Sequence, residues 1–132
     1  MRIAPELFDA IVRHAERDAP NECCGMVAVR DGAAVAVHEA TNTAASPFRF
    51  EVDGMELHRT LTGIEDEGLD LGAIYHSHTR SEPYPSQTDL NFAANWPGVE
   101  WIIVGLAKGA EPVVRSYVIE DGVIREVPVE RA

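Results

Sequence analysis

The residues best suited to chemistry lie in one short segment, residues 76–89, and are His76, His78, Ser86 and Asp89. His76 and His78 directly follow an apolar run, and residues two apart on an extended chain project from the same face. Asp89 follows a loop rich in turn residues and can approach the histidines from the first turn of a helix. Two imidazoles and one carboxylate leave the fourth tetrahedral position of Zn²⁺ open for water, which is typical of catalytic zinc sites.

Such a site would activate water near neutral pH. The net positive charge left on the ion lowers the pKa of its bound water toward about 7. A carboxylate outside the ligand set must then take the proton and deliver it to the leaving group. Glu22, at the start of the first apolar strand, is the candidate for this base, and Ser86 is the candidate donor to the developing oxyanion.

The pattern resembles a known motif. His-x-His, seven residues, Ser, two residues and Asp, with an upstream Glu before Cys-Cys-Gly, is similar to the JAMM motif of the MPN+ zinc metalloproteases. The resemblance extends over most of the chain, including the Arg-Ser-Tyr run at residues 115–117, and is strongest with short bacterial members that release cysteine from ubiquitin-like sulfur carriers. It implies that three residues bind zinc, that Glu22 is the general acid and base, and that Ser86 stabilises the oxyanion. The three implied ligands are His76, His78 and Asp89.

The same resemblance implies an activity and a partner. The expected reaction is hydrolysis of the amide bond after the C-terminal Gly-Gly of a ubiquitin-like sulfur-carrier protein, with cysteine as leaving group and a role in cysteine biosynthesis. Zn²⁺ is the expected cofactor. We expect the extended tail of the carrier to pair with an exposed strand edge near residues 79–85. The chain is too short for the long insertions with which some family relatives grip two ubiquitins. The sequence is compatible with a homodimer.

Other functions fit parts of the pattern. Two histidines and a carboxylate also form the facial triad of non-haem Fe(II) oxygenases, although that class explains Ser86 and Glu22 less well. A non-catalytic module that binds ubiquitin-like tails and uses zinc structurally is a second alternative. A zinc deaminase is disfavoured because the chain lacks a Pro-Cys-x-x-Cys ligand pair.

Structural roles compete for the same residues. Ser86 and Asp89 have the spacing of a helix capping box, and paired histidines at a strand end are often half-buried core residues. The adjacent Cys23 and Cys24 are expected in the core, without a disulfide and without a nucleophilic role. The remaining histidines are expected at the surface: His14, His38 and His58.

Composition narrows the class of protein. The chain has 132 residues, of which 45% are hydrophobic, and this length and balance predict a single domain over residues 1–132. Eleven Lys and Arg against 22 Asp and Glu give a net charge of −11, which disfavours nucleic acid and anionic lipid as partners. No apolar stretch approaches the ~20 residues of a membrane span, so we expect a cytoplasmic protein.

Hydrophobic periodicity and turn signals predict alternating helices and strands. Together they favour an α/β (mixed α+β) fold, a curved mixed sheet flanked by helices, and the resemblance implies the JAMM/MPN, cytidine-deaminase-like architecture. Helices are expected from Pro5 to before Pro20, from Asp53 to Gly68, and from Ser86 to before Pro97. Strands are expected at residues 24–29, 33–38, 48–50, 71–75, 99–106, 113–119 and 123–129.

Overall fold

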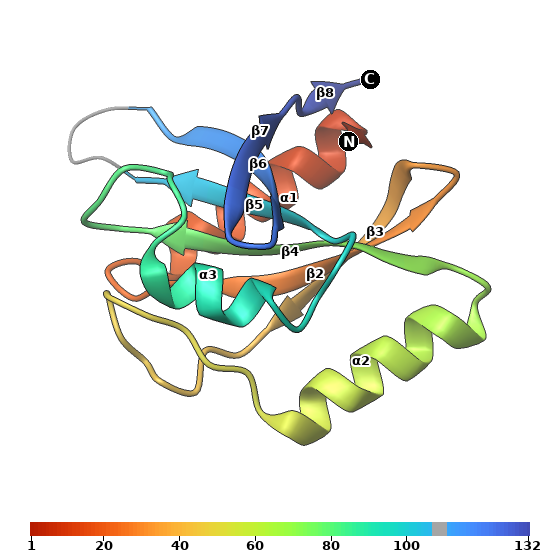
Figure 1. Ribbon diagram of the computed structural model, residues 1–132, viewed down its shortest axis with the longest axis horizontal. Coiled ribbons are helices and arrows are strands. Elements are labelled where there is room, and N and C mark those ends of the chain that lie inside the picture. The colour runs from red at the N-terminus through yellow and green to blue at the C-terminus, as the bar shows by residue number, and fades with distance from the viewer. Residues whose placement is uncertain (107–110) are drawn as a thin grey trace.

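A mixed β-sheet forms the centre of the molecule in the computed structural model, which describes residues 1–106 and 111–132 (Figure 1). Its eight strands follow the order β7-β6-β5-β4-β2-β3-β1-β8, and β4 and β5 are parallel neighbours at its middle. This confirms the predicted mixed sheet with helices. The elements are β1 (Arg2–Ile3), α1 (Pro5–Asp18), β2 (Cys24–Arg30), β3 (Ala33–Ala40), α2 (Gly54–Asp66), β4 (Asp70–His78), α3 (Gln87–Ala93), β5 (Glu100–Gly105), β6 (Val113–Glu120), β7 (Val123–Val127) and β8 (Glu130–Arg131).

Local sequence accounts for the turns and helix ends. Asp31-Gly32 and Asp121-Gly122 have positive φ at both central residues, which is the geometry that joins two antiparallel strands in a tight hairpin. Asp53 caps α2 by accepting hydrogen bonds from two backbone N–H groups, each 3.1 Å long. The predicted hairpins and the second helix are therefore confirmed.

The helices cover opposite faces of the sheet. Side chains of α1 pack with Tyr75 and Ile102 in one buried cluster. Side chains of α2 and α3 pack with Ile74 and Trp101 in another. Because side chains alternate along a strand, successive residues of β4 belong to different faces. The central strand therefore carries two separate sets of buried residues, one toward α1 and the other toward α3.

One expectation about the loops is wrong. Residues 48–50 do not form a strand, because the Asn42 side chain bonds the backbone of that segment on both sides, donating to Arg49 O at 3.0 Å and accepting from Glu51 N at 3.0 Å. Residues 79–85 form a loop, and the outer strands of the sheet are β7 and β8. The expected pairing of a carrier tail with a strand edge near that loop stays a prediction.

The terminal strands β1 and β8 were not expected from the sequence, because two-residue strands carry no periodicity. They pair in parallel with each other, and β1 also pairs in parallel with β3. None of the helices in the described part of the chain combines the length and apolar character needed to cross a membrane.

Candidate metal centre

Three ligand atoms converge at the C-terminal end of β4. The Nε2 atoms of His76 and His78 lie 3.1 Å apart, and Asp89 Oδ2 lies 3.1 Å from the first and 3.3 Å from the second. All three side chains are buried. The structure thus brings together the three residues predicted to bind a metal.

The sheet and one short helix hold this arrangement in place. Residues 76–78 all pair with β5 on one side. On the other side His76 pairs with Cys24 of β2, and Ser77 N donates to Cys23 O at 3.3 Å. Asp89 is held by the predicted capping box. Its Oδ2 accepts from Ser86 N at 2.9 Å, and Ser86 Oγ accepts from Asp89 N at 3.1 Å.

The imidazole rings are oriented by contacts on their far sides. His78 Nδ1 lies 2.8 Å from Glu82 O, so Nδ1 carries the proton and the lone pair of Nε2 faces the cluster. The His76 ring stacks on Phe50 with centroids 4.8 Å apart and meets Trp101 edge-on. Packing therefore sets the orientation of one ring, and a hydrogen bond sets that of the other.

Electrostatics favour a charged carboxylate beside the histidines. Burial alone would raise the pKa of Asp89, but its interactions with His76 and His78 and the Ser86 N–H hold that pKa well below the usual range. Burial would lower the pKa of His78, but hydrogen bonds to Asp89 and Glu82 O outweigh burial and raise it. The cluster thus offers an ionised carboxylate at neutral pH.

The donor set fits a divalent transition metal. Zinc is commonly bound by imidazole nitrogen and carboxylate oxygen, and three protein ligands with one open position form its catalytic arrangement. The three ligand atoms all lie within 4.8 Å of one another. His76 Nδ1 is buried without a hydrogen-bond partner in the described residues, so this ring makes its polar contacts only through the nitrogen that faces the cluster.

Glu22 lies beside the cluster because β2 pairs with β4, with Cys24 opposite His76. Its side chain is only 5% exposed. Burial raises the pKa of this carboxyl to about 7, while attraction to His78 lowers it and repulsion from Asp89 adds to the rise. A carboxyl with such a pKa can both accept and donate a proton near neutral pH.

A small cavity joins these residues. It has a volume of about 290 Å³ and is lined by Glu22, His78, Ser86 and Asp89, together with Phe48, Arg49, Phe50 and Arg80. Ser86 is exposed there, and within the described residues its Oγ accepts a hydrogen bond from Asp89 N, which leaves the hydroxyl proton for another group. The five residues predicted for the site therefore lie in one place.

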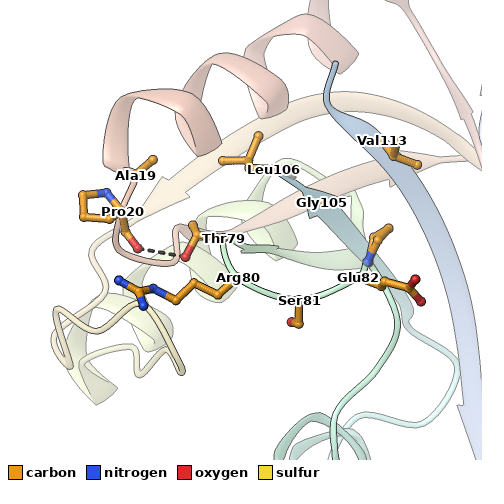
Figure 2. A pocket seen from close by; sticks show the side chains of 10 residues that line it. Ala19, Pro20, Thr79, Arg80, Ser81, Glu82, Gly105, Leu106 and Val113 are labelled. Atoms are coloured by element: carbon orange, nitrogen blue, oxygen red, sulfur yellow. Dashed lines mark hydrogen bonds between the residues drawn. The ribbon is translucent and has the colours of Figure 1, made fainter. Parts of the chain in front are cut away.

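A larger groove adjoins this cavity (Figure 2). Its volume is about 1030 Å³, and Arg80 and Ser81 line both spaces. Thr79 in its wall donates a hydrogen bond to Pro20 O at 2.9 Å and so ties the loop to the end of α1. Sequence reasoning missed the lining residues Phe48, Arg49 and Arg80, because loops carry no periodicity that could place them.

Two other predictions concern residues outside the cavity. Cys23 and Cys24 are buried and free, and burial raises the pKa of each thiol to about 12, so neither is an activated nucleophile. The expectation that His14 lies at the surface is wrong, since it is 2% exposed. It faces the sheet from the apolar side of α1, where its nitrogens contact Tyr75 OH at 2.6 Å and Asp18 Oδ2 at 3.2 Å.

The expectations for the other two histidines differ in outcome. His58 is exposed, as predicted. His38 is half-buried, and its Nε2 has no hydrogen-bond partner in the described residues. Neither histidine is among the residues that line the cavity.

Comparisons with known proteins agree on one family. A family model described as prokaryotic homologs of the JAB domain matches residues 4–120. The CysO-cysteine peptidase of Mycobacterium tuberculosis is 36% identical over 129 residues, covering 96% of this chain and 88% of the relative. The desampylase of Haloferax volcanii is 37% identical over 110 residues, covering 78% of each chain.

A solved structure has the same fold. A JAB1/MPN domain protein from Archaeoglobus fulgidus superposes with a TM-score of 0.61 at 18% identity, covering 99% of this chain and 100% of the other. At this identity the likeness concerns the fold alone.

Proposed function

The chain belongs to the family of prokaryotic homologs of the JAB domain, and on this premise we propose that it is a zinc peptidase acting on a ubiquitin-like sulfur carrier. The proposed reaction is hydrolysis of the amide bond after the carrier's C-terminal Gly-Gly, with release of cysteine. Metallopeptidase activity follows from the family together with the converging ligand atoms. The relative named CysO-cysteine peptidase supports cysteine as the leaving group.

One observation carries the proposal: the three ligand atoms meet at the wall of a cavity that also receives Glu22 and Ser86. A purely structural zinc site uses four protein ligands and is closed to solvent. Here three residues converge, and two polar groups suited to proton transfer and oxyanion binding line the same space. This favours hydrolysis over a structural clip.

We infer that His76, His78 and Asp89 would hold the zinc ion. When bound, zinc supplies Lewis-acid chemistry, polarising a carbonyl and making water acidic enough to ionise near neutral pH. The capping box keeps Asp89 in position, and Glu82 O keeps the Nδ1 proton on His78. These contacts fix the ligands before substrate arrives.

Glu22 and Ser86 would carry out the remaining steps. Glu22 accepts the proton of the attacking water and passes it to the leaving nitrogen, which a carboxyl with a pKa of about 7 can do in both directions. The Ser86 hydroxyl donates to the carbonyl oxygen as it becomes negative. The carbon–nitrogen bond then breaks, and the released products are a carboxylate and an amine.

The test is the Glu22→Gln variant. We expect kcat for cysteine release from a carrier–cysteine conjugate to fall by about 10²- to 10⁴-fold, because the amide cannot take up a proton. Mass spectrometry of the carrier measures the release, and elemental analysis measures the metal.

The matched control is Glu65→Gln, an exposed carboxylate in α2, which should keep wild-type turnover. Retained activity in Glu22→Gln, with zinc and fold intact, would contradict the assigned role. Purification of the wild type with iron and an oxygen-dependent activity would contradict the peptidase itself.

A further inference from the structure

Arg80 is a cation without an acidic partner at the mouth of the site. No carboxylate in the described residues forms an ion pair with it, whereas the neighbouring Arg49 pairs with Glu51. Figure 2 shows the Arg80 side chain extending away from Glu82, the nearest acidic residue along its loop. In a chain with a net charge of −11, such an unpaired positive charge beside a cavity attracts an anionic group of a ligand.

The position of this guanidinium is defined by the loops on both sides of the cavity. Arg80 follows His78 by two residues and lines both the 290 Å³ cavity and the adjoining groove. Its Cζ lies 5.5 Å from the ring centroid of Phe48, which belongs to the facing loop. Phe48 is 72% exposed even with this contact, so stacking on Arg80 is a principal contact of its ring.

We propose that Arg80 binds the free α-carboxylate of the residue that is released and so selects a single amino acid as the leaving group. This inference rests on the proposed function. In a Gly-Gly-cysteine substrate the carboxylate lies only two bonds from the scissile nitrogen, so it must enter the cavity with the reacting atoms. In an isopeptide linked to lysine, the scissile nitrogen lies at the end of a four-carbon stem, and no carboxylate lies near it.

The acidic base of the site gives such a contact a role. Glu22 and Asp89 both line the cavity, and although a bound zinc ion would offset the charge of Asp89, the ionised Glu22 would still repel an incoming carboxylate. Arg80 lines the same cavity and offers planar N–H donors that match a carboxylate in a bidentate arrangement. It therefore offsets the repulsion only for substrates that carry the free acid.

The experiment compares two conjugates of one carrier, which end in cysteine with a free carboxylate or with a carboxamide. Wild type should prefer the acid about tenfold in kcat/KM, through KM, as expected for one partly exposed charge-assisted contact. Arg80→Gln should reduce this preference to about one. Arg49→Gln is the matched control, since Arg49 lines the same cavity with its charge already paired, and it should keep the preference.

Binding gives a readout independent of turnover. In a Glu22→Gln background, fluorescence anisotropy of the labelled conjugates should show the same tenfold preference, lost on adding Arg80→Gln. An acid-to-amide ratio near one in an active wild type, or a ratio that survives Arg80→Gln, would overturn the role of Arg80 while leaving the peptidase intact. A wild type that cleaves neither conjugate would overturn the proposed function and this inference together.

Discussion

Two buried histidine clusters lie on opposite faces of β4. Toward α3, the Nε2 atoms of His76 and His78 meet Asp89 Oδ2 at 3.1 and 3.3 Å. Toward α1, His14 lies between Tyr75 OH at 2.6 Å and Asp18 Oδ2 at 3.2 Å. Both clusters combine imidazole with a carboxylate, and in both the histidines are buried.

The clusters differ in where their nitrogen atoms point. The two nitrogens of His14 face different partners, so each makes its own contact and no common point is left for an ion. The other cluster directs three ligand atoms toward one point beside a cavity. Burial of a histidine is therefore no sign of chemistry, whereas convergence of lone pairs at a cavity is.

The largest expected effect comes from removing one converging ligand. His78→Ala should abolish both zinc binding and peptidase activity while the chain stays folded, because two ligands cannot hold the ion against water. Elemental analysis would measure the metal and circular dichroism the fold. About one zinc per chain in the variant would show that zinc binding does not depend on His78, which would contradict the proposed ligand set.

A smaller effect should appear when protons compete with the metal. The raised pKa of His78 means that its imidazole takes up a proton as the pH falls, starting above its ordinary pKa of 6.5, and the protonated ring cannot bind zinc. Below the raised pKa of His78, zinc affinity should fall about tenfold per pH unit for each proton that zinc must displace. Titration against a chelator between about pH 8 and 5 would measure this, and an affinity independent of pH would contradict it.

The smallest effect on the site should come from the α1 side. Tyr75→Phe removes the hydroxyl that meets His14 Nδ1 and leaves a buried nitrogen without its partner, which should lower the free energy of unfolding by about 1–2 kcal/mol. Urea unfolding of the metal-free protein measures this change. Zinc content and kcat/KM should stay at wild-type values; loss of metal would show that the two faces are coupled.

Much of the fold and the site could be predicted from the sequence because local signals coincide with function. The capping residues Ser86 and Asp89 mark a helix start and also supply part of the site. The pairing of Cys24 with His76, which brings Glu22 to the cluster, is a long-range contact that no local pattern encodes.

The errors have equally local causes. Alternating aromatic residues at 48–50 have a strand-like pattern, but the Asn42 side chain satisfies that backbone instead. His14 follows Ile11 by three residues and precedes Ala15, both of which are buried, so the helical period alone places it on the face that packs against the sheet.

The alternation along β4 also limits how the gene can change in length. Inserting one codon between residues 75 and 76 would shift the rest of the strand by one position and turn the two imidazoles toward α1, while Tyr75 stays where it is. Point substitutions at 75 or 77 alter the α1 side, and those at 76 or 78 alter the metal side. Stability and chemistry can thus evolve separately through substitutions, while the length of this strand must stay constant.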